Sequence, residues 1–595
     1  MLFLQRIIHY LEEGGGMRWL RGFVALMAFV AIAILYPRTA GGPQLSPEGM
    51  DSAQVARNVA SGQGFTTHYI RPLSVFLTDR QKGNTNQPVI FPYPDLAHAP
   101  LHPWLLGGWM KLEEVSLLPS AKPMPPDPAK RDLTVMRFHQ LLYLILLVLV
   151  FRLAARLFDL PVAWLSVLLL GGSGLMWDFA SAGLPTLLSM ILFVVTIHLL
   201  AATELGVREN QWGGGKVFLA IAAMGLLVGA TGLTQYACLA LLVPVAGFAA
   251  AGLERRRIWA GVGVVALCVI AIGGWLGRNH SLSGTWFGTA GFAAYSDSLR
   301  FPADTLERNF QPVDPDSPAD LNKYELAEHR YKLARNLPVI LQRGSLGIEG
   351  GWIAGFFAVS LFLPYRNPTL RKLRWFLIGT WGVLLLVQAL GQTAHSRPDP
   401  VRTSENLLIL LLPMAAIFAA GLFVSILDQL FEAPTPARIA VAALFVFLAA
   451  APTILRSAGW GGGTLGTAAF RMQPTQAMTV GMWVTHLESA VCTEPEALAW
   501  YGGCHSMPLP LNPGTDLQIG RQQVQSRLAV LTPAYLQTSL PTVSIGSIEG
   551  SWERLSTDII VKQEIPDGFP WRHAYTDWFP TYVILAESAR WSTVR

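Results

Sequence analysis

The stretch Leu141-Leu142-Tyr143-Leu144-Ile145-Leu146-Leu147-Val148-Leu149-Val150-Phe151 contains no charged residue, and Arg152 and Arg156 follow it closely. It forms the second half of a mostly apolar segment over 133–151. A helix needs about 20 such residues to cross the hydrocarbon core of a bilayer. Arginines directly after such a segment are typical of its cytosolic end. The stretch therefore predicts a membrane-spanning helix that ends on the cytosolic side.

Working outward from this helix, the chain contains ten more apolar segments of similar length. They are 19–36, 160–176, 184–202, 216–232, 235–253, 258–277, 346–364, 375–391, 406–425 and 437–455. Charged residues make up 14% of the 595 residues and hydrophobic ones 52%, whereas an average soluble protein is about 25% charged. We expect an all-α polytopic membrane domain over 19–455, with about eleven transmembrane helices, preceded by a cytosolic segment over 1–18.

Basic residues beside the apolar segments predict the orientation of the chain. Every second connection is basic, with Arg18, Arg21, Arg152, Arg156, Arg208, Lys216, Arg255, Arg256, Arg257, Arg366, Arg371, Lys372, Arg374 and Arg438. Such connections face the cytosol, so the N terminus is cytosolic and the long loops 37–132 and 278–345 lie outside. The first segment could instead be a cleaved signal peptide, since small residues follow at Thr39-Ala40-Gly41. We expect a multi-pass protein of an inner (plasma) membrane.

The tail over 456–595 is polar and lies on the non-cytosolic side in this topology. Alternation in Arg527-Leu528-Ala529-Val530-Leu531 favours a strand, and we expect a small periplasmic α/β domain. Cys492 and Cys504 lie in this region and could form a disulfide in an oxidising compartment. The net charge of +5 is spread over short clusters, which argues for membrane lipids and against nucleic acid as a partner.

The first outer loop opens with a helix-start signal, Ser46-Pro47-Glu48: a capping residue, a proline and an acid. The helix would carry Asp51, have an apolar stripe of Val55, Ala56, Val59 and Ala60, and stop at Gly62 or Gly64. An amphipathic helix here favours the membrane interface, where a carboxylate is tolerated. Asp51 either takes part in chemistry or only caps and solvates the helix.

Several short motifs around this helix resemble the polytopic type-C glycosyltransferases, which include protein O-mannosyltransferases and lipid A aminoarabinose transferases. The resemblance rests on the acid after the first pass, then Gly62-Gln63-Gly64-Phe65-Thr66, Arg71-Pro72 and Ala99-Pro100-Leu101-His102-Pro103-Trp104. Trp275-Leu276-Gly277-Arg278-Asn279, with Gly284 downstream, and the Trp500-Tyr501 pair agree with it.

The resemblance implies a sugar donor carried on a polyprenyl phosphate and used on the non-cytosolic face. It also implies that Asp51 is the general base that deprotonates a lipid, glycan or protein acceptor, with inversion at the anomeric carbon. The chain departs from the family in three places. Ser52 stands where many relatives have Glu, His98 stands where they often have Lys, and Cys504-His505 replaces an Arg-Pro pair.

Basic residues on the outer side are candidates to bind the donor phosphate. Arg278 lies in the family motif at the outer end of its helix, and Arg397 and Arg402 break the positive-inside bias in the loop 391–405. Arg57 lies two turns beyond Asp51 and either binds phosphate or snorkels; Arg71 is the weakest candidate. His98 could serve only if protonated.

Asp178, in the short outer connection Met176-Trp177-Asp178-Phe179, is a second acidic candidate. It either lines the site, as in some relatives, or caps the next helix. The outer-loop histidines lack a His-x-x-x-His spacing, so we expect no dedicated zinc site; a divalent metal is possible because some relatives use one.

Two rival functions fit many passes and large outer loops. A polymerase or ligase of lipid-linked glycans would rely on outer arginines or a histidine. A non-enzymatic lipid or glycan transporter would need polar groups in mid-pass, where His198 is nearly the only one.

Overall fold

A computed structural model describes most of the membrane domain and parts of the C-terminal region. The described residues are 15–39, 45–83, 89–113, 127–252, 257–308, 326–345, 351–396, 399–431, 435–457, 472, 474–509, 526–531, 573–575 and 583–586.

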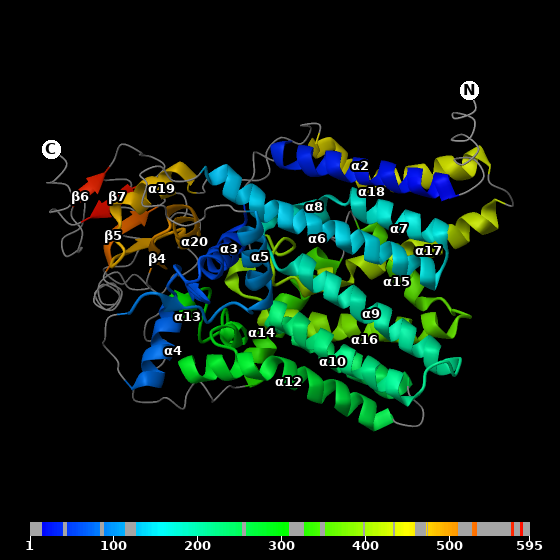
Figure 1. The fold of residues 1–595 in the computed structure, drawn as a ribbon, viewed down its shortest axis with the longest axis horizontal. Helices are drawn as coiled ribbons and strands as arrows, with labels where there is room; N and C mark the ends of the chain where they lie inside the picture. Colours follow the sequence, from blue (N-terminus) through cyan, green and yellow to red (C-terminus); the bar gives the residue numbers. More distant parts are fainter. Residues whose placement is uncertain are drawn as a thin grey trace.

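Each of the eleven predicted segments coincides with an apolar helix in a single bundle (Figure 1). The bundle contains α2 (Gly15–Thr39), α6 (Pro128–Leu157), α7 (Leu160–Gly172), α8 (Gly174–Ala182), α9 (Thr186–Arg208), α10 (Gly214–Thr234), η1 (Tyr236–Leu241), α11 (Leu242–Gly252), α12 (Arg257–Ser283), α15 (Trp352–Phe362), α16 (Pro368–Gly391), η7 (Leu407–Leu411), α17 (Leu412–Leu430) and α18 (Pro436–Ser457).

Seven helices among the described residues are long and apolar enough to cross a membrane, and α7 with α8 makes an eighth if this pair, bent by 59°, counts as one span. The other three predicted passes fall on shorter apolar helices, at Leu20–Tyr36, Tyr236–Ala251 and Trp352–Phe362. The predicted fold class is therefore confirmed, and the chain is a multi-pass membrane protein.

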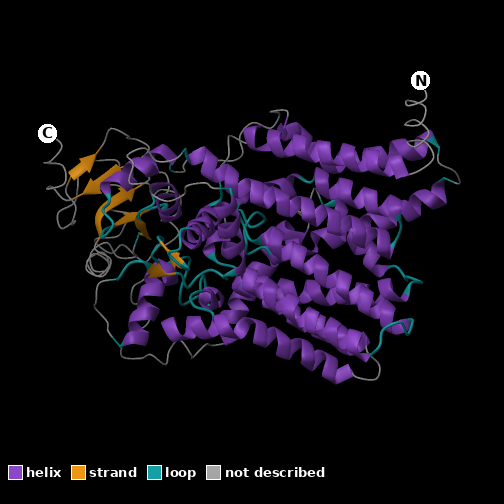
Figure 2. Cartoon of the chain, in the orientation of Figure 1, coloured by secondary structure: helices purple, strands orange, loops and turns teal. Residues whose placement is uncertain are grey.

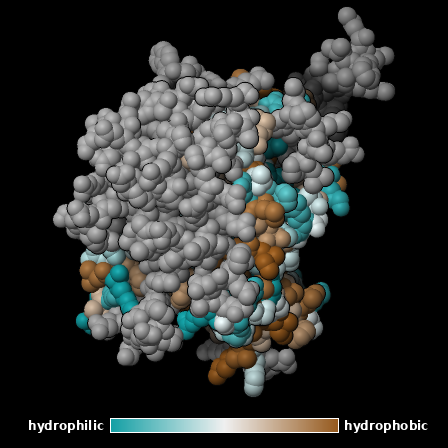
Figure 3. All heavy atoms as spheres, turned by 90° about the vertical axis from the view of Figure 1, so that its left-hand side faces the viewer, coloured by the Kyte–Doolittle hydropathy of each residue, from teal (hydrophilic) through white to brown (hydrophobic). Residues whose placement is uncertain are grey.

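The helices are apolar both inside the bundle and on its outer surface. The most apolar 18 residues of the span Leu407–Leu430 are fully buried inside the bundle. Phe218, Ile258, Trp259 and Phe362 are more than two-thirds exposed, and Figure 3 shows apolar side chains at the surface when the molecule is seen from the C-terminal end. Such an exposed apolar surface is what a bilayer covers.

Three short helices lie at one end of the bundle, next to the C-terminal strands (Figures 1 and 2). They are α3 (Pro47–Ala60), α4 (Pro72–Lys82) and α5 (Leu101–Leu112), joined by a two-stranded antiparallel sheet of β1 (Thr66–Thr67) and β2 (Tyr93–Pro94). The second long outer loop, which follows α12, contains η2 (Ala290–Ala294), α13 (Thr305–Arg308), α14 (Leu326–Val339) and η4 (Ile340–Ser345), and η6 (Ala394–Ser396) precedes η7.

The C-terminal region contains a mixed five-stranded sheet in the order β4-β3-β5-β7-β6. Its strands are β3 (Ser489–Cys492), β4 (His505–Pro508), β5 (Ser526–Leu531), β6 (His573–Tyr575) and β7 (Val583–Ala586), with α19 (Pro474–Trp483), α20 (Pro495–Ala497) and η9 (Leu498–Gly502). The strand predicted from the alternation at 527–531 is present as β5. Cys492 and Cys504 are both buried free thiols, so the structure has no disulfide between them.

The sheet is joined to the first outer loop by main-chain hydrogen bonds. Ile70 N donates to the Ser506 carbonyl at 2.8 Å, and Ser506 N donates to the His68 carbonyl at 2.9 Å. The chain that leads into α4 therefore pairs with the edge strand β4. This pairing holds the C-terminal region beside α3.

Candidate functional site

The helix α3 begins where the sequence predicts. Ser46 is its N-cap, and the Ser46 hydroxyl accepts a hydrogen bond from Gly49 N at 3.0 Å. The same hydroxyl donates to the Ala182 carbonyl at 2.8 Å, and a Cβ at Gly49 would collide with that carbonyl. The first turn of α3 is thus fixed tightly against the end of α8, and with it the position of Asp51 one turn later.

The helix α3 is more deeply buried than its amphipathic pattern predicts. Every residue from Gly49 to Asn58 is buried, because α5 covers one side of the helix and the segment 495–503 another. A Cβ at Gly107 of α5 would lie 2.7 Å from the Ala56 carbonyl, so α3 and α5 approach backbone to backbone. Asp51 therefore lies inside the protein and not on an exposed interfacial helix.

Asp51 is 3% exposed and its carboxylate is held by two cationic groups. Arg71 Nη2 forms an ion pair with Asp51 Oδ2, and His98 Nε2 lies 3.4 Å from the same oxygen. The other oxygen, Oδ1, accepts a hydrogen bond from Gln54 Nε2 at 3.3 Å. Both oxygens of this buried carboxylate therefore have a partner within the protein.

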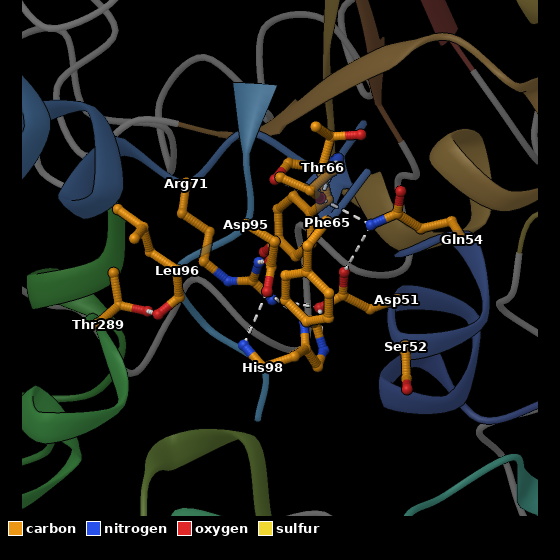
Figure 4. A network of polar contacts seen from close by, with 12 residues as sticks. Asp51, Ser52, Gln54, Phe65, Thr66, Arg71, Asp95, Leu96, His98 and Thr289 are labelled. Atoms are coloured by element: carbon orange, nitrogen blue, oxygen red, sulfur yellow. Dashed lines mark hydrogen bonds and ion pairs between the residues drawn. The ribbon is translucent and has the colours of Figure 1, made fainter. Parts of the chain in front are cut away.

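A second buried carboxylate, Asp95, stands behind His98. Asp95 Oδ2 accepts hydrogen bonds from the backbone N–H of His98 at 2.9 Å and lies 3.2 Å from His98 Nδ1. Its other oxygen lies 4.0 Å from Arg71 Nη1. Figure 4 shows these four side chains pointing toward one another from α3, from the start of α4 and from the chain after β2. We call Asp51, Arg71, Asp95 and His98 the charged cluster.

Opposite charges in this cluster shift the pKa values of its members. Burial disfavours the protonated imidazole, but Asp51 and then Asp95 outweigh it and raise the pKa of His98 above its ordinary value. Burial likewise disfavours the ionised Asp95, yet His98 and Arg71 hold the pKa of Asp95 below its usual range. The charges of His98 and Asp95 therefore stabilise each other.

Ser52, the residue after Asp51, faces away from the charged cluster (Figure 4). Its hydroxyl lies 3.0 Å from His102 Nδ1 on α5, and His102 Nε2 lies 3.0 Å from His139 Nε2 on α6. His139 Nδ1 is 2.8 Å from the Val135 carbonyl and must donate to it. The tautomers follow along the chain, so Ser52 donates to His102, and the three residues join α3, α5 and α6.

Arg278, the candidate from the Trp-x-x-Arg-Asn motif, lies beside the cluster and binds its backbone. Its guanidinium donates to the Asp95 carbonyl at 2.9 Å and to the Phe65 carbonyl at 3.3 Å. It also stacks over the Trp275 ring, 4.6 Å from the centroid. Arg278 thus holds the chain that carries Asp95 and His98.

Asp178 and Arg402 form a separate group at the same end of the bundle. Arg402 Nε lies 2.6 Å from Asp178 Oδ2, and Arg402 Nη1 lies 3.1 Å from Asp399. The Tyr36 hydroxyl donates to Asp178 Oδ1 at 2.5 Å. This group ties the loop before η7 to α8 and α2. Arg397 lies outside the described residues.

Arg57 binds the C-terminal region. Its guanidinium is 4% exposed and donates to the carbonyls of Trp500 at 2.7 Å and Ala499 at 2.9 Å. On α6, Asp132 accepts hydrogen bonds from Trp500 Nε1 at 2.8 Å and from the Tyr501 hydroxyl at 2.7 Å. The Trp500-Tyr501 pair is therefore the point at which the C-terminal region is anchored to the membrane domain.

The structure brings together three residues that the sequence put forward, Asp51, His98 and the weakest candidate Arg71, and adds Asp95. Arg278 contacts the backbone of the cluster, whereas Asp178, Arg402 and Arg57 make contacts elsewhere. Asp95 was missed by sequence reasoning, although it precedes His98 by three residues, and the Arg71-Pro72 pair was the one signal for Arg71. Among the residues that the structure describes, no three His, Cys, Asp or Glu side chains are arranged to hold a metal ion, and divalent metal use stays a prediction.

No protein family and no curated protein sequence matches this chain, but solved structures do. One is the oligosaccharyltransferase of Archaeoglobus fulgidus in complex with Zn and sulfate, with a TM-score of 0.51, 12% identity, and coverage of 90% of this chain and 70% of that one. Another is ArnT from Cupriavidus metallidurans bound to undecaprenyl phosphate, with a TM-score of 0.51, 13% identity, and coverage of 95% and 98%. At such identities the similarity shows the fold alone, and this shared fold agrees with the one that the sequence motifs lead us to expect.

Proposed function

We propose that this chain, which has the type-C fold, transfers a sugar from a polyprenyl-phosphate donor to an acceptor on the non-cytosolic face of a membrane. The observation that carries the proposal is the environment of Asp51. A carboxylate buried to 3% exposure, with a guanidinium and an imidazole on one oxygen, is a positioned base next to a pair of cations. Buried charged groups in such an arrangement are typical of catalytic sites.

The proposed transfer reaction uses both the Asp51 carboxylate and the cations beside it. An acceptor hydroxyl attacks the anomeric carbon of the donor sugar, its proton passes to the Asp51 carboxylate, and a new C–O bond forms. The bond between the anomeric carbon and the phosphate oxygen breaks, and the electron pair leaves with the polyprenyl phosphate. A single displacement of this kind inverts the anomeric carbon. The proton on Asp51 is then released to solvent as the products depart.

The leaving phosphate develops negative charge, and cations beside Asp51 stabilise it. Arg71 offers paired N–H donors, a geometry suited to phosphate oxygens, and its side chain is 15% exposed. His98 lies beside it with a side chain 20% exposed, and the two nearby carboxylates raise its pKa. We assign donor phosphate binding to these two residues, with Arg278 positioning the chain that carries His98.

The donor class is supported by one of the structural neighbours, because ArnT from Cupriavidus metallidurans was solved with undecaprenyl phosphate. The orientation is supported by charge. The basic connection between α9 and α10 lies at the end of the bundle away from the C-terminal strands (Figure 1), and basic connections face the cytosol. The charged cluster and the C-terminal domain then face the periplasm of an inner membrane.

The test is a transfer assay with the Asp51→Asn variant. The purified protein in lipid nanodiscs is supplied with lipid-linked sugars extracted from its native membrane, and with envelope glycans, lipids and proteins as acceptors. Released polyprenyl phosphate and the mass gain of acceptors are measured by mass spectrometry. Removing a general base costs roughly 10²–10⁴-fold in rate, so we expect transfer to disappear.

The matched control is Asp127→Asn, at an exposed N-cap where Asn caps a helix as well as Asp; this variant should keep wild-type transfer. Near-normal transfer by Asp51→Asn contradicts the assignment of the base. Movement of lipid-linked sugar across the bilayer with no change in acceptor mass would instead favour a transporter.

A further inference from the structure

Both ring nitrogens of His98 lie close to buried carboxylates. Asp95 Oδ2 lies 3.2 Å from Nδ1 and Asp51 Oδ2 lies 3.4 Å from Nε2. Asp95 is 1% exposed and Asp51 3%. An imidazole can donate from both nitrogens only as the imidazolium, so an arrangement with an ionised carboxylate at each nitrogen selects the charged form.

We infer that His98 is a titratable phosphate-binding residue whose charge is set by Asp95, so that donor binding is switched off as pH rises. The inference rests on the proposed function and deepens it: Asp95 is a positioning residue that acts through His98. The donor-binding state of the cluster has two cations, Arg71 and His98, against two carboxylates. Loss of the His98 proton leaves a net negative cluster that repels a phosphate.

A histidine at position 98 loses its charge at a different pH from a lysine at the same position. A lysine stays charged across the whole physiological range, whereas an imidazole titrates close to it. Burial lowers and the two carboxylates raise the pKa of His98, with a net rise above its ordinary value. The imidazolium therefore persists to higher pH than in an ordinary histidine, and its charge is lost as pH increases through the raised pKa.

The other groups around His98 do not supply this switch. Arg71 from the start of α4 stays charged, and Tyr236 from η1 donates its hydroxyl to the His98 carbonyl at 3.3 Å. Arg278 of α12 holds the Asp95 carbonyl. Burial, His139 and His98 keep the pKa of His102 on α5 well below its ordinary value, so His102 stays neutral.

One more histidine near the site does titrate at alkaline pH and has to be separated from His98. His395 Nε2 lies 2.9 Å from Glu307 Oε2, and this carboxylate raises the pKa of His395 to about 10. His395 contacts α13 and not the charged cluster. A His395→Gln variant therefore tests whether this ion pair contributes to any alkaline loss of binding.

The experiment measures the affinity of the full-length protein in nanodiscs for undecaprenyl phosphate between pH 7 and pH 10. The second pKa of a phosphate monoester is about 6, so the charge of the probe is nearly constant over this range. Loss of one charge-assisted contact corresponds to about a tenfold to hundredfold loss of affinity. Wild-type protein should show this loss as pH rises, and His395→Gln should show the same loss.

Three variants sharpen the result. His98→Lys should hold its affinity up to about pH 9, because lysine stays protonated there. Asp95→Asn removes one carboxylate and should move the loss to lower pH by about one unit or more. His98→Gln should bind weakly at every pH with no transition. His280→Lys, at an exposed position on α12, is the control and should behave as wild type; thermal unfolding at pH 7 checks that each variant is folded.

The outcomes separate this inference from the proposed function. Wild-type binding that does not change with pH, or a folded His98→Lys protein that keeps the alkaline loss, overturns the role of His98 and leaves the proposed function standing. If His395→Gln abolishes the loss, the switch belongs to the other ion pair and the inference is wrong. If wild-type protein does not bind undecaprenyl phosphate at any pH, both proposals fail.

Discussion

Arg57 belongs to α3 and Arg71 pairs with Asp51 of the same helix. Both arginines are largely buried, yet they have different kinds of partner. Arg57 donates to two neutral backbone carbonyls of η9, whereas Arg71 pairs with the ionised side chain of Asp51. A guanidinium that binds backbone carbonyls stabilises the joint between two regions. One that shares a carboxylate with a histidine can exchange that partner for a phosphate. The kind of acceptor, more than burial, distinguishes the anchor from the functional arginine.

The comparison of the two arginines predicts that substitution of Arg71 causes the largest loss of transfer. Arg71→Ala should reduce transfer by about 10²-fold or more, because it removes a donor to the leaving phosphate and an electrostatic partner of the base. Arg71→Lys keeps the charge but not the paired donors, and should lie between the alanine variant and wild type. The measurements are the transfer rate and the affinity for undecaprenyl phosphate. Wild-type affinity in a folded Arg71→Ala protein would show that Arg71 does not bind phosphate.

A smaller effect on transfer, and a larger one on stability, is expected at Arg57. Arg57→Ala breaks two hydrogen bonds from a charged group and should destabilise the joint by about 3 kcal/mol. We expect faster proteolytic cleavage of the C-terminal region and a transfer rate about tenfold lower. Undecaprenyl phosphate affinity should change little.

Asp132→Ala offers a matched comparison, since it removes the acceptors of Trp500 and Tyr501 on the other side of the same joint. It should reproduce the proteolysis seen for Arg57→Ala. A strong loss of affinity for undecaprenyl phosphate in Arg57→Ala, but not in Asp132→Ala, would mean that Arg57 contacts the donor. The sequence analysis allowed this role, because Arg57 was one of the candidates to bind phosphate.

The smallest effect is expected at Arg402, which pairs with Asp178 and Asp399 away from the charged cluster. A half-exposed ion pair contributes about 1 kcal/mol or less, so Arg402→Ala should lower transfer by no more than about fivefold. Asp178→Asn should have a similar effect, measured in the same transfer assay. An inactive Arg402→Ala variant beside an active Asp51→Asn variant would favour a polymerase or ligase of lipid-linked glycans.

Local signals in the sequence predicted the local structure well. The Ser46-Pro47-Glu48 cap places the start of α3 correctly because a helix start depends on residues within one turn. The apolar segments predicted the bundle because a membrane requires long apolar helices. Neither signal depends on distant parts of the chain.

The charged cluster could be predicted only in part. Asp51 and His98 stood out through a resemblance, but Asp51 meets Arg71 across 20 residues and no periodicity reports that pairing. The partners of Arg57 are backbone carbonyls more than 440 residues away. Every residue has a backbone carbonyl, so the sequence does not indicate which carbonyls accept from Arg57. Its anchoring role became visible only from the fold.

A structure of the protein with undecaprenyl phosphate, solved in nanodiscs by electron cryomicroscopy at neutral pH, tests the central claim most directly. We predict that the phosphate contacts Arg71 and His98 at hydrogen-bond distance, about 3 Å, with the Asp51 carboxylate facing the position of the sugar. A phosphate bound at Arg402 or Arg57, with the charged cluster unchanged and out of reach of the lipid, would contradict the account.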